Sequence, residues 1–590
     1  MTSPTGRRVY HEPVKNLEIA RLFDEMARLL EVQNESVFRV RAYARAAQTL
    51  ETLGESVEAV AARGELAQLP GIGRELAAKI GEYLATGRLA QLDELRGGLP
   101  PTFLNLLEIR GLGPKTARLL YDRLGVDSVS RLEALARSGE ILRVPGIREK
   151  TRENILKSIA LWQAGRARTP LARAREIAAR VAEALAAHGG ADRIEVAGSL
   201  RRMRETVKDI DILVTSTEPA RVIETFVSLP SILEVSARGD TKASVRHAEG
   251  LRIDLRVVEP DAFGAALQYF TGSKDHNVRL RELARRQGLS VSEYGVFDEK
   301  TGVRVAGKTE AEVYGVLGLP YIPPELRENA GELEAARDGR LPALVTRAAI
   351  RGDLHAHTDA SDGHHSLEHL IEAAQARGYE YVIVSDHSKS ATVARGLGAD
   401  ELRAQIARIR ALQPRYRIRI LAGSECDVLG DGTLDFPDDT LRELDLVLAA
   451  VHSRFKQARL EMTARIVRAL ANPYVNILAH PTGRLLGARE PYDVDLDAVF
   501  EAARAHNKAV EINASPERLD LNDVHARRAA GLGVPVAIST DTHWLANLDN
   551  LELGLGIARR AWIGPAQVVN ALPLADLLTW AHRGRPGARE

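Results

Sequence analysis

Histidines and carboxylates are concentrated in the last 240 residues of this 590-residue chain. Twelve of the 16 histidines lie after residue 350, and six of them stand within or directly after short apolar runs. Imidazole and carboxylate ligands together suit zinc, manganese or iron. Clustered ions of these metals can bind a phosphate, lower the pKa of a water molecule and let it attack phosphorus. The pattern therefore predicts a metalloenzyme site built from His355, His357, Asp362, His387, Glu425, His452, His480, Asp541 and His543.

A second set of carboxylates lies in the middle of the chain. Asp209 and Asp211 are two residues apart in one strand-like run, and Asp254 lies in another, at residues 252–257. Alternate residues of a strand face the same side, so the first two carboxylates point to one place. Three hard oxygen ligands can hold two Mg²⁺ or Mn²⁺ ions, which polarise an attacking hydroxyl and stabilise a leaving pyrophosphate. The turn at Gly198 and Ser199 can hold a triphosphate by backbone N–H and hydroxyl groups.

The first 160 residues repeat one local pattern three times, at residues 69–73, 109–113 and 144–148. Each copy has an apolar residue, a tight glycine turn and then a helix. Glycine lets backbone N–H groups come close to a phosphate at the following helix N-terminus, and such contacts ignore base sequence. The repeat therefore predicts helix-hairpin-helix DNA contacts. The residues expected to approach DNA are Gly71, Gly73, Gly111, Gly113 and Lys115.

Composition is that of a globular protein, with 45% hydrophobic and 27% charged residues and no apolar run long enough to span a membrane. The net charge is zero, but residues 1–170 carry 26 Lys and Arg against 21 Asp and Glu, a mildly basic balance compatible with nucleic acid. The single cysteine, Cys426, excludes an internal disulfide, and residues 1–15 lack a secretory core. We therefore expect a cytoplasmic, nucleoid-associated protein.

The histidine-rich region needs elements that bring its polar residues together. Its apolar runs resemble buried parallel strands that carry chemistry at their C-terminal tips, and the segments between them, such as residues 366–378 and 496–506, have helical patterns. This alternation predicts an α/β barrel with its active site on one rim. The seven expected strands are residues 352–357, 382–387, 420–425, 446–452, 475–480, 509–513 and 536–543.

The carboxylate triad, together with Tyr269-Phe270-Thr271-Gly272-Ser273, resembles the nucleotidyltransferase superfamily and specifically the family X DNA polymerases. The resemblance implies that Ser199 and Arg202 bind the triphosphate, and that Asn277 and Arg281 contact nucleotide and template. It implies catalysis by Asp209, Asp211 and Asp254. The full set of nucleotide-binding residues that it implies is Gly198, Ser199, Arg202, Tyr269, Phe270, Gly272, Asn277 and Arg281.

The resemblance extends to the N-terminal region, where residues 38–47 and 69–80 are similar to the small helical domain that binds the 5′ phosphate of a gap. In some members this domain removes a 5′-deoxyribose phosphate through a lysine Schiff base, and Lys79 falls at the position of that nucleophile. Glu75 stands where some lyase members carry a second basic residue. Two roles for Lys79 therefore stay open, a lyase nucleophile or a phosphate contact.

Residues 353–544 resemble the PHP (polymerase and histidinol phosphatase) phosphoesterases and contain all their ligand motifs. The resemblance implies two or three bound ions of Mn²⁺, Zn²⁺ or Fe. One would be held by His355, His357, Glu425 and Asp541, a second by Glu425, His452 and His480, and a third by Asp362, His387 and His543. In this interpretation Glu425 bridges the first two ions. Asp359 is an alternative to Asp362 as a ligand.

The whole chain thus resembles a bacterial or archaeal family X DNA polymerase with a C-terminal PHP domain. We expect a monomer that takes gapped or nicked DNA and dNTPs, fills short gaps in DNA repair, and acts as a 3′→5′ exonuclease, 3′-phosphoesterase or abasic-site nuclease. Two rival hypotheses are a metabolite nucleotidyltransferase fused to a phosphatase, and a DNA-binding nuclease with a silent polymerase site. The hairpins argue against the first rival, and the complete carboxylate triad argues against the second.

The expected fold is multidomain, with an all-α helix-hairpin-helix part, an α+β palm and thumb, and a distorted seven-stranded β/α barrel. The segment after residue 322 is proline-flanked and charged, which suits a linker. The expected boundaries are a helical DNA-binding domain at 1–95, helix-hairpin-helix fingers at 96–165, a palm at 166–260, a thumb at 261–322, a linker at 323–350 and a PHP domain at 351–590.

Overall fold

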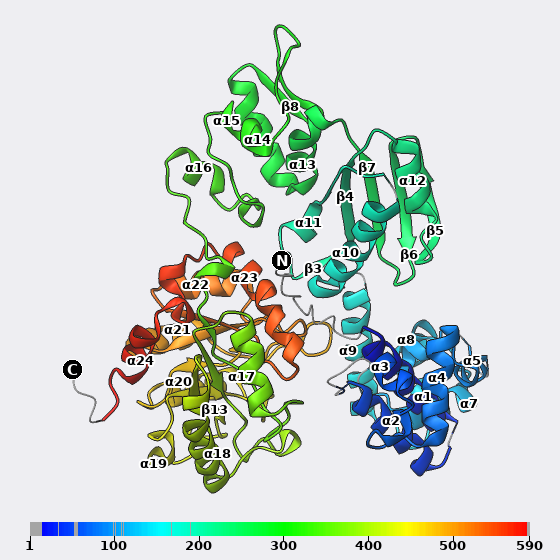
Figure 1. The fold of residues 1–590 in the computed structure, drawn as a ribbon, viewed down its shortest axis with the longest axis vertical. Helices are drawn as coiled ribbons and strands as arrows, with labels where there is room; N and C mark the ends of the chain where they lie inside the picture. The colour runs from blue at the N-terminus through cyan, green and yellow to red at the C-terminus, as the bar shows by residue number, and fades with distance from the viewer. Residues whose placement is uncertain are drawn as a thin grey trace, which may run out of the picture. The chain divides into compact units, whose positions relative to one another are not determined.

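The computed structural model of the protein describes residues 14–33, 35–51, 53, 57–97, 99–100, 102–107, 109, 111–166, 168–188 and 190–586. The chain divides into two compact units, Met1–Ala164 and Gly165–Glu590 (Figure 1). The polar N-terminal segment discussed above lies outside the described residues as far as residue 13.

The first unit is helical around one apolar core, which includes Phe23, Tyr43, Phe103 and Leu132. It consists of α1 (Val14–Val32), α2 (Val37–Glu51), α3 (Val57–Ala62), α4 (Arg74–Thr86), α5 (Ala90–Gly97), α6 (Leu104–Leu107), α7 (Pro114–Leu124), α8 (Val129–Ser138) and α9 (Glu149–Arg166).

Three turns of this unit share one geometry. The central glycines, Gly71, Gly111 and Gly146, have φ angles of +75°, +84° and +89°. In each turn the residue after the glycine donates its N–H to a carbonyl three residues earlier, at 3.0, 3.0 and 3.1 Å. Because a left-handed backbone favours glycine, the sequence fixes where each helix begins. The predicted helix-hairpin-helix fold is confirmed, including its third copy, where an arginine replaces the second glycine.

A five-stranded mixed sheet with the order β2-β4-β7-β6-β5 forms the predicted palm. Its central strands β4 and β7 are parallel neighbours. The elements are β1 (Thr169–Pro170), α10 (Leu171–His188), β2 (Arg193–Val196), α11 (Gly198–Arg201), β3 (Thr206–Val207), β4 (Asp209–Thr215), α12 (Pro219–Val227), β5 (Ile232–Arg238), β6 (Lys242–His247) and β7 (Arg252–Val257).

The thumb packs two helices against a three-stranded antiparallel sheet of order β10-β9-β8. A Cβ atom at Gly264 would lie 2.2 Å from backbone atoms of Thr309, so only glycine lets these two segments approach. The elements are α13 (Phe263–Thr271), α14 (Lys274–Arg286), β8 (Leu289–Ser292), β9 (Gly295–Asp298), β10 (Arg304–Ala306), α15 (Glu310–Gly315) and α16 (Glu332–Arg337).

The segment expected to be a linker, residues 323–350, is packed in the structure. Leu326 and Leu333 belong to the apolar core of the thumb, and the Arg327 guanidinium is fully buried, where it pairs with Glu310 at 2.6 Å. Further on, the Val345 N–H donates to the carbonyl of Ile563 at 3.0 Å. Two of the charged residues that suggested a linker, Arg327 and Glu332, are thus buried in ion pairs, whereas Arg337, Asp338 and Arg340 are exposed.

Seven parallel strands form the last sheet in the order β11 to β17, which is their order along the chain. Successive side chains alternate between an interior cluster, as at Tyr381 and Ile383, and the layer under the helices, as at Val382 and Val384. The predicted barrel is confirmed. The strands are β11 (Gly352–Asp353), β12 (Tyr381–Val384), β13 (Arg419–Asp427), β14 (Leu446–Ala450), β15 (Ile477–Leu478), β16 (Ala509–Asn513) and β17 (Val536–Ser539).

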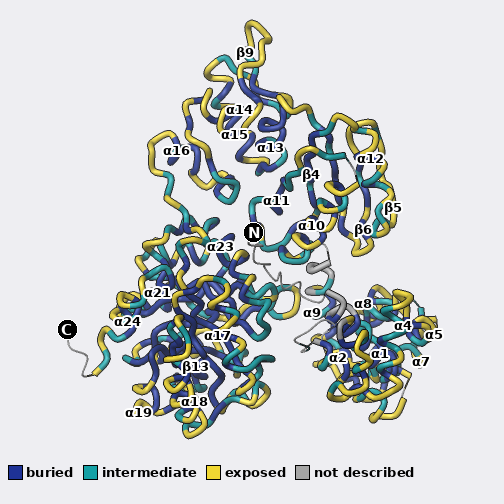
Figure 2. The backbone as a smooth tube through the Cα atoms, viewed as in Figure 1, coloured by how far each residue is buried: buried dark blue, intermediate teal, exposed yellow. Residues whose placement is uncertain are grey.

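Helices follow these strands around the barrel, as the predicted alternation requires, with α17 and α21 close to the expected ranges. In Figure 2 the strands of this region are coloured as buried, and the exposed segments lie on the helices and loops outside them. The helices are α17 (Leu367–Ala376), α18 (Ala399–Leu412), α19 (Asp438–Leu441), α20 (Arg459–Leu470), α21 (Leu496–Ala505), α22 (Asp523–Gly531), α23 (Leu551–Arg560) and α24 (Leu574–His582).

The buried side chain of Asn570 joins the first and last strands of the barrel. Its amide nitrogen donates to the carbonyls of Gly352 and Ile538 at 3.0 and 2.8 Å, and its oxygen accepts the Ile538 N–H at 3.0 Å. Nearer the rim, Ala356 and Thr542 form a parallel bridge. Asn570 thus provides hydrogen-bond partners for backbone groups of the first and last strands, which would otherwise be buried and unsatisfied.

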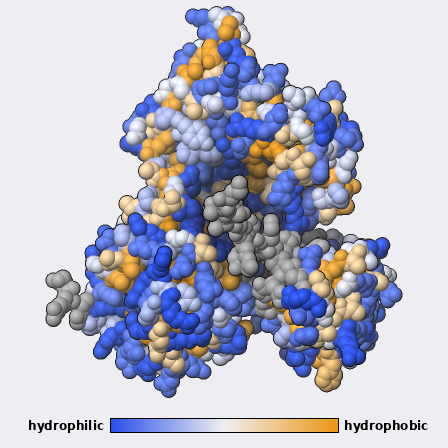
Figure 3. Space-filling model, in the orientation of Figure 1, coloured by the Kyte–Doolittle hydropathy of each residue, from blue (hydrophilic) through white to orange (hydrophobic). Residues whose placement is uncertain are grey.

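Figure 3 shows a largely hydrophilic face with small, scattered apolar groups. Among the described residues, every helix is either too short or too polar to cross a bilayer.

Replacing Asn570 with alanine should destabilise the barrel. The change leaves two carbonyls and one N–H group buried without their partners, at a cost of about 2–4 kcal/mol in the free energy of unfolding. Chemical denaturation of the full chain, followed through the barrel tryptophans, measures the loss. Asn550→Ala is the matched control, because the Asn550 side chain does not cap α23. Equal midpoints for the two variants would contradict this role of Asn570.

Candidate active sites

The three central aspartates lie on one face of adjacent strands. Asp211 of β4 is directly opposite Asp254 of β7, and Asp209 is two residues before Asp211 on the same strand. Burial, together with the Asp209 and Asp254 carboxylates, raises the pKa of Asp211 to about 7. Arg252 partly offsets this charge, since its Nε donates to Asp254 at 3.0 Å. Such crowding of negative charges is unfavourable without a cation to neutralise them, so these carboxylates form a candidate cation site.

The turn that precedes these strands touches them. Gly198 has a φ of +64°, and a Cβ atom there would lie 2.3 Å from Oδ2 of Asp211. Only glycine therefore lets the first turn of α11 approach the carboxylates. This places half-buried Ser199 beside the triad, where sequence reasoning expected a phosphate-binding hydroxyl.

Two neighbouring arginines connect α11 to the thumb. Arg201 forms a bidentate pair with Glu310, at 2.8 and 2.7 Å, and donates to the Thr271 hydroxyl at 2.7 Å. Arg202 donates from Nε to Glu328 at 3.0 Å and from Nη1 to the carbonyl of Thr271. The family resemblance singled out Arg202 and gave no role to Arg201, whose partner Glu310 lies 109 residues away along the chain.

The other expected nucleotide-binding residues lie where α13 meets α14. The half-buried rings of Tyr269 and Phe270 pack edge to face, with centroids 5.2 Å apart. The Asn277 amide donates to the carbonyl of Tyr269 at 2.7 Å, and Arg281 donates to the carbonyl of Asn277 at 3.3 Å. Gly272, between the helices, has a φ of +68°. Asn277 is buried, and its hydrogen bond holds the backbone of Tyr269 near the end of α13.

In the helical unit, the expected DNA contacts are on the outside. Gly71, Gly73, Gly111 and Gly113 are exposed, and a Cβ atom at Gly73, Gly111 or Gly113 would meet nothing within 4 Å. Lys115 is exposed on the first turn of α7. Half-buried Lys79 lies on α4, one turn after Glu75.

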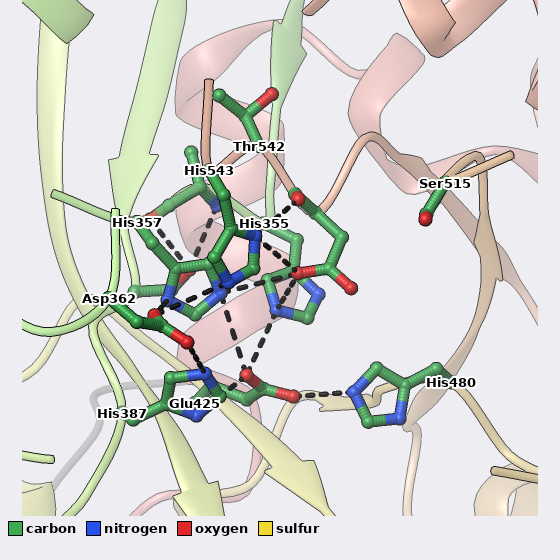
Figure 4. A network of polar contacts seen from close by, with 12 residues as sticks. His355, His357, Asp362, His387, Glu425, His480, Ser515, Thr542 and His543 are labelled. Atoms are coloured by element: carbon green, nitrogen blue, oxygen red, sulfur yellow. Dashed lines mark hydrogen bonds and ion pairs between the residues drawn. The ribbon is translucent and has the colours of Figure 1, made fainter. Parts of the chain in front are cut away.

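In the barrel, five imidazoles lie close to the carboxylate of Glu425. Figure 4 labels His355, His357, His387 and His480 around it. Oε2 faces His355, His357 and His387, at 3.3, 3.5 and 3.0 Å. Oε1 faces His452 and His480, at 3.2 and 2.6 Å. Both oxygens are thus committed to different sets of imidazoles, which is the geometry that a bridging ligand requires.

Two further groups of side chains complete the cluster. Oδ1 of Asp541 lies 3.5 and 3.4 Å from Nε2 of His355 and His357. Asp362 lies 3.5 Å from His387 and 3.3 Å from His543, whereas Asp359 is exposed. The structure therefore brings together all nine residues that the sequence suggested.

The groups close enough to share one ion differ in part from the predicted sets. His355, His357 and Asp541 form one group, which is the first predicted set without its fourth member, Glu425. A second contains Asp362, His387 and His543 with His357 added. In the third, His387 joins Glu425 and His452 in place of the expected His480. The histidine rings are packed so closely that neighbouring sets overlap.

Several buried ring nitrogens form no well-aligned hydrogen bond among the described residues, although carboxylate oxygens lie within 3.5 Å of some of them. An unpaired buried polar atom is costly, and a cation removes the cost. The donor set of imidazole and carboxylate therefore fits zinc, manganese or iron. The atoms are Nε2 of His355, both ring nitrogens of His357, Nδ1 of His387, Nε2 of His452 and Nδ1 of His480.

Charge is unevenly divided among these imidazoles. Burial disfavours the charged ring of His355, but the carboxylates of Glu511 and Asp541 outweigh it and raise its pKa well above the usual value. Burial and the neighbouring His543 and His387 lower the pKa of His357 to about 4. The surrounding charges thus shift the pKa values of these two neighbouring imidazoles in opposite directions.

Sequence reasoning missed the residues that orient the imidazoles. Oε1 of Glu511 contacts Nδ1 of His355 at 2.7 Å, and Asp427 contacts Nδ1 of His452. Asn513 donates to both Glu511 and Asp541, at 3.1 and 3.0 Å. Their signal was present, since Asp427 and Asn513 end strands and Glu511 is two residues before a strand end. A carboxylate on the second ring nitrogen fixes the tautomer of a ligand histidine.

Backbone strain also gathers at this rim. His480 and Asp541 have φ angles of +65° and +54°, which residues with side chains seldom adopt. Such positions persist where the surrounding structure dictates them, commonly at functional sites. The buried Arg484, four residues after His480, pairs with Glu205 of the palm at 2.8 Å.

Four family descriptions match parts of the chain. Residues 14–89 match "Helix-hairpin-helix domain", and residues 103–160 match "SAM-like Helix-hairpin-helix tandem". Residues 266–328 match "DNA polymerase beta thumb", and residues 353–515 match "PHP domain".

Three relatives cover different shares of the chain. It is 29% identical over 344 residues to DNA polymerase lambda of Rattus norvegicus, which covers 53% of this chain and 56% of that protein. It is 27% identical over 231 residues to a protein of Thermoanaerobacter sp. (strain X514) named "probable phosphatase", covering 37% of this chain and 89% of that protein.

The third relative matches almost end to end. The chain is 39% identical over 571 residues to the DNA polymerase/3'-5' exonuclease PolX of Bacillus subtilis (strain 168), which covers 96% of this chain and 99% of that protein. Because this match spans the hairpins, the palm, the thumb and the barrel, the chain belongs to the family X DNA polymerases that carry a C-terminal PHP domain.

Proposed function

We propose that the chain is a DNA polymerase that fills short gaps and a 3′→5′ exonuclease that trims DNA ends, with one active site for each activity. The observation that carries this proposal is the presence of two separate charged centres, three carboxylates on the palm and nine ligand-type side chains on the barrel rim. Both activities appear in the name of the full-length relative.

At the palm, Asp209, Asp211 and Asp254 would hold two Mg²⁺ or Mn²⁺ ions. Bound ions of this kind activate the primer 3′-hydroxyl and neutralise the leaving pyrophosphate. The chain's own residues position the nucleotide: Ser199 and Arg202 take the triphosphate, and the surface of Tyr269 and Phe270 packs against the sugar. Asn277 supports that surface through its bond to the carbonyl of Tyr269.

At the barrel, the nine rim residues would hold two or three ions of manganese, zinc or iron. Bound ions of this kind supply a hydroxide at neutral pH and polarise the phosphoester. Glu511 and Asp427 keep their partner imidazoles in one orientation. Arg518, whose Nε lies 3.4 Å from Asp541, adds a positive charge beside the place where phosphate would bind. The same chemistry can serve 3′-phosphates and abasic ends.

The helical unit would grip the DNA backbone through the N–H groups of its glycine turns and through Lys115. For Lys79 we favour a phosphate contact over a lyase nucleophile, because Glu75 lies one turn away on the same face of α4. We propose a monomer, since the residues of each candidate site all come from one chain. We also propose that the protein acts where chromosomal DNA is found.

Separate substitutions should divide the two activities. Asp209→Ala should abolish primer extension on gapped DNA with dNTPs and Mn²⁺, because it removes one of three ion ligands, and should leave nucleolytic trimming intact. His355→Ala should do the reverse. Rates are read from labelled primers on gels. Each variant is the control for the other.

Three outcomes would contradict the proposal. A single substitution that removed both activities would mean one shared site. Trimming without any extension by the wild type would favour the rival nuclease with a silent polymerase site. Hydrolysis of small phosphoesters without action on DNA would favour the metabolite rival.

Adding Mn²⁺ should stabilise the barrel, because ions bound to the native rim shift the folding equilibrium. At a free Mn²⁺ concentration of 100 times the dissociation constant, the free energy of unfolding should increase by about 2.7 kcal/mol. Thermal melting with and without Mn²⁺ measures it. Glu425→Gln should lose most of the gain, since this carboxylate contacts five imidazoles, whereas Glu461→Gln on the exposed start of α20 should keep it. An undiminished gain in Glu425→Gln would refute the role of Glu425 in ion binding.

DNA binding by the hairpins should depend steeply on salt. Lys115→Ala should weaken binding of gapped DNA about equally for all sequences, and should reduce the slope of log affinity against log salt by about one. Fluorescence anisotropy at several NaCl concentrations tests this. Lys300→Ala, an exposed lysine of the β9–β10 turn, is the comparison. Identical slopes for Lys115→Ala and the wild type would exclude this phosphate contact.

A further inference from the structure

The arginine proposed to bind the triphosphate is fixed in place by its neighbours. The Arg202 side chain is only 12% exposed, and two of its three guanidinium nitrogens donate hydrogen bonds, Nε to Glu328 and Nη1 to the carbonyl of Thr271. A guanidinium held at two nitrogens has one orientation of its plane. It adjoins Gly272, where a Cβ atom would lie 3.3 Å from Nη1.

The carboxylate that holds Arg202 is itself shared with the barrel domain. Oε1 of Glu328 accepts from Nε of Arg202 at 3.0 Å and from Nη1 of Arg560 at 2.8 Å. Arg560 is the last residue of α23, a helix that packs on β16 and β17. One oxygen thus joins an arginine of the palm to an arginine of the barrel domain.

Arg560 is anchored from its own side. Its side chain is 3% exposed, and Nη2 donates to Asp523, the first residue of α22, at 2.6 Å. Nη1 also donates to the main-chain carbonyl of Arg202 at 2.9 Å. The barrel domain therefore holds both the carboxylate partner of Arg202 and its backbone.

The same helix also fixes the next residue of the palm. Met203, which has a φ of +57°, packs against Gly556, one turn before Arg560. A Cβ atom at Gly556 would lie 2.4 Å from the terminal methyl carbon of Met203. Backbone, side chain and counter-charge around Arg202 are thus all set by α23.

We propose that Arg560 of the PHP domain is a positioning residue for the polymerase reaction, acting through Glu328 to orient Arg202 towards the triphosphate of the incoming dNTP. This inference rests on the proposed role of Arg202. It assigns to the barrel domain a contribution to nucleotide binding that is separate from its hydrolytic rim, because none of the nine rim residues takes part in this network.

Loss of the fixed orientation of Arg202 should reduce the affinity for dNTP more than it changes turnover. A guanidinium that has lost its carboxylate partner keeps its charge but samples more orientations, so the bound triphosphate must fix it again. The aspartates that perform the chemical step are not part of the network. We therefore expect the KM for dNTP to rise and kcat to stay nearly constant.

The test uses full-length protein in single-nucleotide gap filling, with exonuclease rates measured on the same preparations. Arg560→Met should raise the KM for dNTP about tenfold, which is about the effect of one charge-assisted hydrogen bond, and should change kcat and exonuclease rate less than about twofold. Arg560→Lys, which keeps the charge, should recover part of the loss. Glu328→Gln should have a similar effect, and the Glu328→Gln/Arg560→Met double variant should not add a second tenfold step.

Arg559→Met is the matched control. Arg559 is on the same helix and also contacts the preceding segment, pairing with Glu325 at 2.7 Å and donating to the carbonyl of Val345, but it does not touch Arg202 or Glu328. Its KM for dNTP should match that of the wild type. A general loosening of the domain contact would instead raise KM in both variants and overturn the proposal.

Other outcomes are equally decisive. If Arg560→Met and Glu328→Gln melt like the wild type and keep its KM for dNTP, this inference is refuted while the proposed polymerase function stands. If Arg560→Met fails to fold, Glu328→Gln carries the same expectation and decides. If the wild type itself does not extend primers, the proposed function fails, and it fails before any variant is compared.

Discussion

Like charges and unpaired imidazoles cannot be gathered in a protein interior without something to balance them, and this constraint shapes both centres of the molecule. On the palm, three carboxylates share one sheet face, and the pKa of Asp211 rises to about 7 because of burial and its acidic neighbours. On the barrel rim, ring nitrogens of five histidines are buried without a well-aligned hydrogen bond among the described residues. Without a bound cation both arrangements would cost folding free energy, and both provide the ligand atoms that a cation needs.

The architecture meets this constraint by placing charge where strands end. Parallel strands bring their C-terminal tips to one rim, so residues from β11 to β17 converge although they lie up to 188 residues apart. The rim then needs its own support. Glu511 and Asp427 orient imidazoles from behind, and left-handed backbone at His480 and Asp541 aims two ligand-type side chains inward. Asn570 closes the barrel below them.

Sequence alone predicted the parts that depend on local pattern. The period of apolar residues gave the strands and helices of the barrel, and the glycine turns gave the three hairpins. Eight of the nine rim residues were identified because each stands at or near a strand tip, a position that can be read along the chain, whereas Asp362 lies in a loop. Asp362 rather than Asp359 could be resolved only in three dimensions, because both are in one loop and only one faces His387 and His543.

What sequence did not predict depends on contacts between distant segments. Residues 323–350 look like a linker because they are charged and contain prolines, yet Arg327 and Glu332 are buried by partners from the thumb. The link from Asp523 through Arg560 and Glu328 to Arg202 joins four residues separated by up to 358 positions, and none stands out in its own neighbourhood. A charged residue in a helix is normally a solvated one. Arg560 departs from that rule because the end of α23 is buried against the palm. Its guanidinium donates to the carbonyl of Arg202 and to the carboxylates of Glu328 and Asp523. The domain that would cut DNA thereby supports the arginine that is proposed to bind the nucleotide at the site that would extend DNA.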